Sequence, residues 1–212
     1  MKKNEKFVIT INREVGSGGR TVGQKLAEKL NVKYYDKALI RGLTEKYGMT
    51  LEEIERLKAG QGNTSWWEEF TRFYHSFKKT LSIDSDDKPT TEAMFETERR
   101  IYESLAAQES CVVAGRSAFL VFRDWPNHLN VFIQASLTHR IERIQKRQGV
   151  STQHALDIID QLDAGRETYI KKYSDKSRYD TRNYQLVISM DDLSEDEAVN
   201  VIMAYIEGVM KS

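Results

Sequence analysis

The sequence has a single cysteine and none of the ligand spacings typical of a structural metal. Cys111 lies inside an apolar run, so an internal disulfide is excluded. Four histidines, at positions 75, 128, 139 and 154, do not combine with this cysteine into a zinc-binding pattern. A chain of 212 residues can bury roughly 70% of the surface that it exposes when unfolded, so it needs neither cross-link to fold.

Long hydrophobic runs and net charge are also missing. The apolar stretch near the N-terminus stops at Asn12 and Arg13, which is too short for a signal peptide, and no run approaches the ~20 apolar residues of a membrane span. Lys plus Arg and Asp plus Glu number 32 each, which disfavours a generally basic nucleic-acid binder and a highly charged disordered chain. We therefore expect a cytoplasmic protein with neither nucleic-acid nor membrane partners.

Short apolar runs alternate with helical patterns along the chain. Strands are predicted at 7–11, 32–35, 111–114, 129–133 and 184–189. A helix is predicted over 20–30, where Val22, Leu26 and Leu30 recur on one face, and Ser194 and Glu197 have the spacing of a capping box that opens the last helix. This alternation predicts an α/β fold, a five-stranded parallel sheet with helices on both faces.

One stretch, 37–108, contains no convincing strand. It is interpreted as a helical lobe inserted into a single domain that covers 1–212. Trp66, Phe70, Phe73 and Phe77 share one helix face within it, which is either the core of the lobe or the face of a homodimer.

Ligands bind at the carboxyl ends of the strands of a parallel sheet, so the loops 12–20, 36–41 and 115–124 are the places to search. Charge is uneven further along. Residues 140–182 hold ten Lys/Arg against seven Asp/Glu, and residues 183–212 hold one Lys against six acids. The basic stretch either holds an anion or solvates a helix face.

A glycine-rich segment follows the first strand. Against the phosphate-binding pattern G-x-x-x-x-G-K-[ST], Gly19 and Thr21 match, Glu14 replaces the first glycine and Arg20 replaces the lysine. Backbone N–H groups at the start of a helix, approached through glycines, favour an anion. Two alternatives remain open: a plain connecting turn, and a dinucleotide site in which Asp36 would bind a ribose, although that pattern lacks its third glycine.

These residues resemble the cytidylate kinase-like family, a branch of the P-loop nucleoside monophosphate kinases. The resemblance rests on six segments in order: Arg13 to Arg20 (REVGSGGR), Cys111 to Ala118 (CVVAGRSA), Pro126 to Ser136 (PNHLNVFIQAS), Arg140 to Arg143 (RIER), Asp163 to Arg166 (DAGR) with Tyr169, and Tyr184 to Ile188 (YQLVI). It covers essentially the whole chain except about 60–90.

The resemblance implies a three-layer P-loop NTPase fold, ATP and Mg²⁺ as cofactors, and phosphoryl transfer to a nucleoside monophosphate, a small-molecule substrate. It also makes 140–182 a lid. The implied donor-side residues are Gly16, Ser17, Gly18, Gly19, Arg20, Thr21 and Arg140, with Thr21 on the metal. Arg20, Arg143 and Arg166 would be catalytic, and Asp36, Arg41, Arg116 and Asp163 would bind the acceptor.

Each assignment has a simpler alternative. Arg140 and Arg143 would otherwise solvate a helix face, Arg166 and Asp163 would form an ion pair within one helix, and Asp36 would cap a helix over 37–47. Tyr35, Tyr169 and Tyr173 would either stack on a base or pack in the core or the lid, and packing is the favoured role. Ser117 stands where cytidylate kinases carry an aspartate that contacts the nucleotide. The departures at Glu14, Arg20 and Ser117 keep a second function open, a nucleotide-binding regulatory protein with little or no kinase activity, and the dinucleotide oxidoreductase is third.

Overall fold

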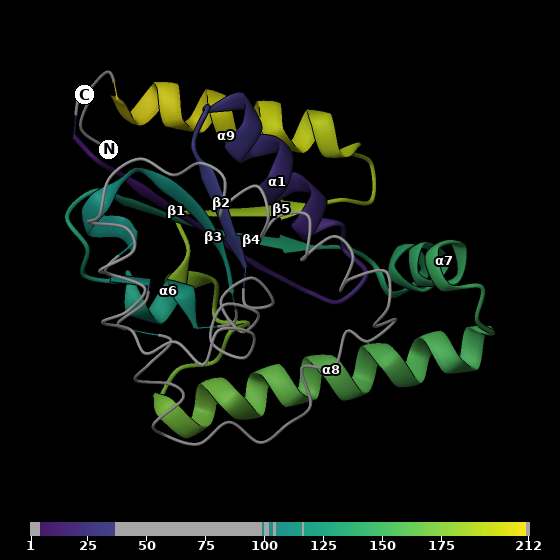
Figure 1. Ribbon diagram of the computed structural model, residues 1–212. Helices are drawn as coiled ribbons and strands as arrows, with labels where there is room; N and C mark the ends of the chain where they lie inside the picture. Colours follow the sequence, from purple (N-terminus) through teal and green to yellow (C-terminus); the bar gives the residue numbers. More distant parts are fainter. Residues whose placement is uncertain (1–4, 37–98, 100–101, 104, 116, 211–212) are drawn as a thin grey trace, which may run out of the picture.

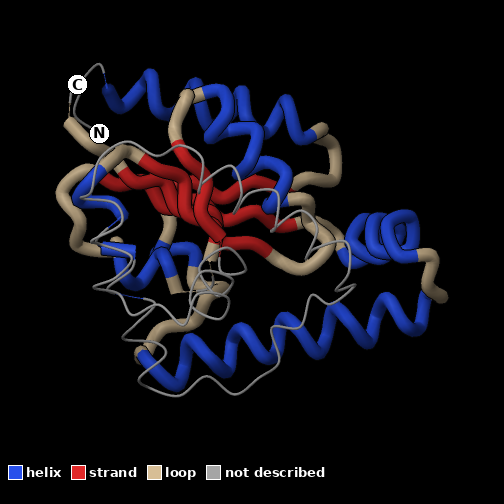
Figure 2. Tube along the Cα trace, viewed as in Figure 1, coloured by secondary structure: helices blue, strands red, loops and turns tan. Residues whose placement is uncertain are grey.

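Five parallel strands form one sheet in the computed structural model, which describes residues 5–36, 99, 102–103, 105–115 and 117–210. They are β1 (Val8–Arg13), β2 (Lys33–Asp36), β3 (Cys111–Ala114), β4 (His128–Gln134) and β5 (Leu186–Ser189), in the order β2-β3-β1-β4-β5 (Figures 1 and 2). The predicted parallel sheet is confirmed, and each strand lies within about two residues of its predicted place.

The central strand β1 is buried on both faces, as parallel strands between two helical layers must be. It pairs with β3 and β4 at once, and Val8, Ile9 and Ile11 are fully buried. Its polar positions are satisfied internally. The Thr10 hydroxyl donates to Oδ1 of Asn130 at 2.7 Å, and the Asn12 amide donates to the Tyr184 hydroxyl at 2.8 Å. These buried hydrogen bonds fix β1 against β4 and the segment before β5.

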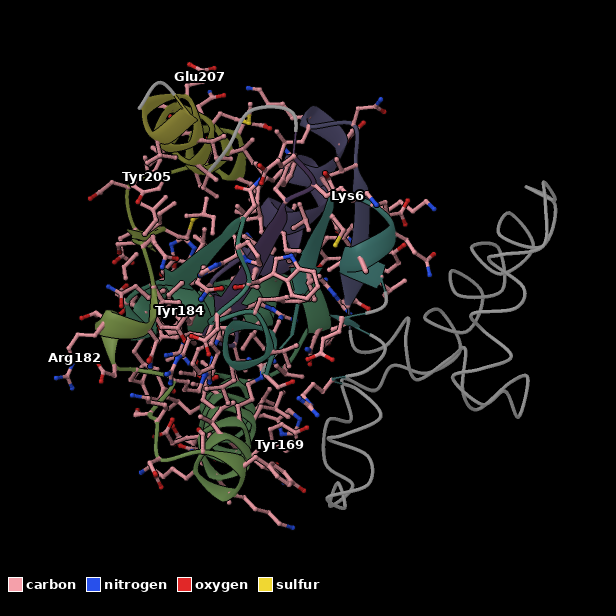
Figure 3. All side chains as sticks on the ribbon, turned by 90° about the vertical axis from the view of Figure 1, so that its left-hand side faces the viewer. Lys6, Tyr169, Arg182, Tyr184, Tyr205 and Glu207 are labelled. Atoms are coloured by element: carbon pink, nitrogen blue, oxygen red, sulfur yellow. The ribbon has the colours of Figure 1, made fainter. Side chains whose placement is uncertain are left out.

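Helices cover both faces of the sheet (Figure 1). On one face α1 (Gly19–Lys29) packs against α9 (Glu195–Met210); on the other lie α6 (Ala118–Val121) and α8 (Thr152–Tyr173). Figure 3 shows Tyr205 of α9 and Tyr169 of α8 on opposite sides of the sheet. The helix α7 (Leu137–Gln148) packs against α8, and the short helix η1 (Thr181–Asn183) leads to β5.

The last helix begins as its sequence predicts. The Ser194 hydroxyl accepts from the Glu197 amide at 3.3 Å, and the Glu197 carboxylate accepts from the Ser194 amide at 2.9 Å, which is the reciprocal pattern of a capping box. Across the surface, Lys25 of α1 pairs with Asp196 of α9 at 2.7 Å. Among the residues described, no helix combines the length and apolar character that a membrane span requires.

The predicted helical lobe falls almost entirely on residues outside the described part of the chain. Arg41 and the aromatic face at 66–77, with its dimer interpretation, lie there too. At the far end of the lobe the described residues of 99–108 are helical. Tyr102 and Leu105 are buried there against Val8 and Cys111, which anchors this end to the sheet.

Candidate active site

The glycine segment forms a tight loop between β1 and α1. Gly16 and Gly18 have φ of +82° and +85°, a left-handed conformation that favours glycine. A Cβ at Gly16 would lie 2.7 Å from the Arg140 carbonyl oxygen, and one at Gly18 would lie 3.3 Å from Cζ of Arg143. Both glycines are therefore required by backbone conformation and by the close approach of α7. These glycines therefore let the loop pack closely against α7.

The start of α1 is open to an anion. Gly18 is its N-cap residue, no side-chain oxygen caps this end, and the first turn carries no acidic residue. Ser17 is fully buried, and its hydroxyl donates back to the Glu14 carbonyl at 3.0 Å. A helix N-terminus without a side-chain cap presents N–H groups and the positive end of the helix dipole, the arrangement that suits phosphate.

Arg140, in the first turns of α7, reaches the loop from the β4 side. It is 8% exposed, its Nε donates to the Val15 carbonyl at 2.7 Å, and its terminal nitrogens pair with Asp163 and, at 3.3 Å, with Glu14. Arg140 therefore does not solvate a helix face. It holds the backbone of the loop at Val15 while two carboxylates hold the guanidinium.

Asp163 lies at the centre of an arginine cluster. Three guanidinium groups surround its carboxylate: that of Arg140, that of Arg166 at 3.3 Å and that of Arg178 at 2.9 Å. The Val15 amide also donates to it, at 3.2 Å. The ion pair between Asp163 and Arg166 within α8 forms, as the simpler alternative predicts, but it is one of several contacts. Asp163 joins α8 to the loop at the end of β1.

Arg178 is a member of this cluster that the sequence did not single out. It is fully buried, contacts Asp163 and the carbonyl of Arg13, and lies 5.8 Å from the centre of the Phe132 ring. Its segment, 174–180, has no periodicity that predicts burial. The only signal was its place in the basic stretch 140–182. Buried arginines are rare unless paired, so its position points to a role in holding the site.

Glu14, which had no role in the sequence, is a bridge between the loop and α7. One carboxylate oxygen pairs with Arg140 at 3.3 Å, and the other accepts from the Ala135 amide at 3.2 Å. The carboxylate also places a negative charge beside the glycine loop, where a glycine would place none. Glu14 therefore has two opposite effects on the binding of an anion: its contacts hold the loop in place, and its negative charge repels the anion.

Arg143 lies over the beginning of α1. It pairs with Glu195 of α9 at 2.7 Å and donates to the Thr21 hydroxyl at 3.4 Å. Burial raises the pKa of the Glu195 carboxyl. The hydrogen bond from Arg143 and its positive charge lower that pKa by more than burial raises it, so the net shift is downward. The Nε of Arg143 is buried with no hydrogen-bond partner. A buried donor beside Gly18 is a place where an incoming oxygen would be stabilised.

Arg20, at the position of the P-loop lysine, points to the opposite side. Its Nε and one terminal nitrogen donate to Oδ2 of Asp36 at 3.1 and 2.9 Å. Asp36 ends β2 and is 2% exposed. The sequence assigned these residues to donor and acceptor separately, and the structure brings them together.

Other expected residues divide into two groups. Arg41 and Arg116 lie outside the described residues. Ser117 is fully buried and precedes α6, so its hydroxyl does not face an open site. Tyr35 and Tyr169 are buried in the core, and burial followed by the hydrogen bond to Glu109 raises the pKa of the Tyr35 hydroxyl. These tyrosines have the packing role that was expected.

Solved structures share this architecture. An uncharacterized protein from Eubacterium ventriosum superimposes with a TM-score of 0.64 at 24% identity, covering 95% of this chain and 99% of its own. Shikimate kinase from Bacteroides thetaiotaomicron gives a TM-score of 0.52 at 19% identity, covering 95% and 98%. At these identities the likenesses concern the fold alone.

Comparison of the sequence with known proteins identifies the family as well as the fold. Cytidylate kinases of Methanopyrus kandleri and Staphylothermus marinus are 25% and 26% identical to the chain, each alignment covering 96% of it and 95% and 98% of the relative. The model of the cytidylate kinase-like family matches residues 8–192, from the first residue of β1 to just beyond β5. With the glycine loop and the arginines of α7 and α8 all inside that range, the chain belongs to the cytidylate kinase-like family.

Proposed function

We propose that the protein is a kinase that transfers the γ-phosphoryl group of ATP to the phosphate of a nucleoside monophosphate. The observation that carries this proposal is the convergence of three arginines from the lid region, Arg140, Arg143 and Arg166, on the glycine loop at the carboxyl end of β1. Family membership over residues 8–192 supports the same reaction.

The reaction needs positioning and charge stabilisation more than covalent chemistry. An oxygen of the acceptor phosphate forms a bond to the γ-phosphorus, the bond from that phosphorus to the β–γ bridging oxygen breaks, and the electron pair leaves with ADP. The N–H groups at the start of α1 would hold the donor phosphates. Arg143, with its unpartnered Nε, and Arg166, which is partly exposed at the end of β1, would stabilise charge on the transferred group.

Thr21, in the first turn of α1, offers Mg²⁺ a hydroxyl oxygen beside the loop. Among the described residues no three His, Cys, Asp or Glu side chains gather as an all-protein metal site would need. This fits Mg²⁺, which takes most of its ligands from phosphates and water when it accompanies a nucleotide. When bound, Mg²⁺ would neutralise charge on the phosphates. The Thr21 hydroxyl, which accepts a hydrogen bond from Arg143, would give up that hydrogen bond to bind the metal.

Cytidylate is the first acceptor to test. Relatives that carry the name cytidylate kinase align along nearly the whole chain. Against this stands Ser117, which is buried at the position where the family resemblance leads us to expect an aspartate. We therefore propose a nucleoside monophosphate as the acceptor, and a panel of monophosphates with different bases will identify which one is the substrate.

A second function is favoured by one observation. Three of the described cations at the loop are already paired with carboxylates: Arg20 with Asp36, Arg140 with Glu14 and Asp163, and Arg143 with Glu195. Such pairing lowers the net positive charge that ATP would meet. A protein that binds nucleotide as a signal and transfers phosphate slowly would show the same arrangement. A dinucleotide site is less favoured, because the Asp36 carboxylate is occupied by Arg20.

The test is a coupled assay of ADP release with Mg-ATP against CMP, UMP, AMP and GMP. Turnover that depends on the acceptor and falls at least about a hundredfold in Arg166→Ala is expected. Lys171→Ala, on the exposed face of the same helix, is the matched control. Binding of Mg-ATP without turnover on any acceptor would instead support the regulatory function, and absence of ATP binding would end both.

A further inference from the structure

Arg20 and Asp36 form an ion pair across the gap between the glycine loop and the end of β2. Two N–H groups of Arg20 converge on the same oxygen of Asp36, at 3.1 and 2.9 Å. The Asp36 side chain is 3% exposed and that of Arg20 is 21% exposed, so the carboxylate is fixed inside the protein and the guanidinium lies at its surface. A buried carboxylate that holds a partly exposed cation directs where that cation can act.

The direction follows from the sheet. The strand order is β2-β3-β1-β4-β5, so the end of β2 lies two strands from β1 on one side, and α7 follows β4 on the other side. Arg140 and Arg143 reach the glycine loop from the β4 side. Arg20 starts in α1, directly after the loop, and is turned toward β2. Positive groups therefore lie on both sides of the loop, from different elements and with different partners.

The chemistry of arginine makes this turn meaningful. A lysine at this position would present a single ammonium group on a flexible chain, whereas a guanidinium is planar and donates through five N–H groups in a fixed fork. Asp36 accepts from two of them and thereby fixes the plane of the group. The negative charge of Asp36 offsets part of the charge of Arg20 toward either phosphate, so the direction in which Arg20 is held decides which substrate it meets.

We propose that Arg20 binds the phosphate of the acceptor rather than the triphosphate of ATP, and that Asp36 is the positioning residue that turns it there. This inference rests on the proposed kinase function and refines it. The residue at the lysine position then serves the second substrate, and the donor phosphates depend on the loop backbone and on the arginines of α7 and α8.

The first test removes the guanidinium and separates the two substrates. In Arg20→Met, we expect the Kd for Mg-AMP-PNP, a non-hydrolysable analogue of Mg-ATP, to change by less than about threefold when measured by calorimetry. The Kd or KM for the acceptor, with CMP as first probe, should rise at least about tenfold. Lys25→Met is the matched control, since it removes one positive charge from the exposed face of the same helix and should change neither constant.

The second test concerns positioning. Asp36→Asn keeps the shape of the side chain and removes its charge, so Arg20 is released toward the loop. The acceptor KM should rise, and the affinity for Mg-AMP-PNP should stay the same or increase, a split that general loosening of the fold would not produce. Arg20→Lys keeps the charge but loses the fork, and should show the same split. In the double variant that combines Arg20→Met with Asp36→Asn, the increase in acceptor KM should be less than the sum of the two single effects in free energy. Each single change already breaks the contact that the two residues share.

The opposite split overturns the inference. If Arg20→Met weakens Mg-AMP-PNP at least about tenfold and leaves the acceptor constants unchanged, Arg20 is a donor-side cation. Failure of the proposed function looks different: the wild-type protein would then bind or phosphorylate none of the four monophosphates. In that case the assignment of Arg20 to an acceptor phosphate is overturned together with the proposed function. Melting temperatures of all variants identify any that do not fold.

Discussion

The Arg178 guanidinium donates to Oδ1 of Asp163 at 2.9 Å, although Asp163 lies in the middle of α8 and Arg178 lies beyond its end. The same guanidinium contacts the carbonyl of Arg13, the last residue of β1. One buried side chain therefore joins the strand that leads into the glycine loop to the middle of α8. The opposite charge on Asp163 makes burial of that side chain tolerable.

Asp163→Asn should be strongly destabilising. Three arginines lose their shared carboxylate, and breaking a buried ion pair from one side typically costs about 3–5 kcal/mol. Urea unfolding followed by circular dichroism measures the change. Asp160→Asn, one turn earlier on an exposed face of α8, is the control and should cost less than about 1 kcal/mol. Equal stability of the two variants would contradict the central place of Asp163.

Arg178→Met should destabilise the protein less than Asp163→Asn does. Asp163 keeps Arg140 and Arg166, so the main loss is that of the hydrogen bonds to Asp163 and Arg13, about 1–3 kcal/mol. Arg182→Met is the control, because Arg182 lies at the surface and pairs only with Asp180 among the described residues. A wild-type unfolding midpoint for Arg178→Met would show that the buried charge is dispensable.

Glu14→Gln should bind ATP more tightly. The substitution removes a negative charge beside the glycine loop and leaves an oxygen that can still accept from the Ala135 amide. We expect the Kd for Mg-AMP-PNP to fall about threefold or more at low salt, with a smaller effect at high salt. Titration calorimetry at two ionic strengths measures it. A weaker Kd would mean that the grip of Glu14 on Arg140 matters more than its charge.

Gly16→Ala should abolish nucleotide binding, and Gly149→Ala should not. Both glycines have positive φ, but a Cβ at Gly16 meets the Arg140 backbone at 2.7 Å, whereas one at Gly149 meets nothing within 4 Å. Both variants carry backbone strain of about 1 kcal/mol, and only the first displaces the loop from α7. Unfolding and Mg-AMP-PNP binding, measured on both proteins, separate strain from displacement.

Stability should fall in alkali because of Tyr35. Burial and the hydrogen bond to Glu109 raise the pKa of this tyrosine above its ordinary value of 10. The unfolded chain therefore loses the proton first, and Tyr35 alone lowers the free energy of unfolding by about 1.4 kcal/mol per pH unit once the pH exceeds about 10. Tyr35→Phe should remove this contribution to the alkaline slope. The measurement is urea unfolding at several pH values above about 10, each compared with the free energy of unfolding of the same protein at pH 7. An unchanged alkaline slope would contradict the raised pKa.

The sequence predicts the sheet well and the site only in part. Strands such as Cys111–Ala114 are short apolar runs between helical patterns, and burial on both faces leaves little choice for such runs in an α/β chain. The glycines are equally visible, because a left-handed turn before a helix calls for them. Both features depend on neighbours along the chain.

Contacts between distant segments were not predictable in the same way. Arg20 was identified, but its partner Asp36 follows from the rotamer of one side chain and the position of β2. Glu14 was a departure from a pattern until Arg140 and the Ala135 amide gave it partners 121 or more residues away. Arg178 has no periodic neighbours at all. Each of these roles is set by the tertiary structure, and a single sequence carries no sign of it.

The 22 residues of α8 extend over about 33 Å, and Asp163 is the twelfth of them (Figure 1). Before Asp163 the helix packs on α7 through Ala155 and Ile159, and after it the helix packs on the sheet through Tyr169 and Ile170. The arginine cluster therefore lies at the boundary between two differently packed halves of one helix. Loosening this cluster would let the half that carries α7 move relative to the half that is fixed to the sheet.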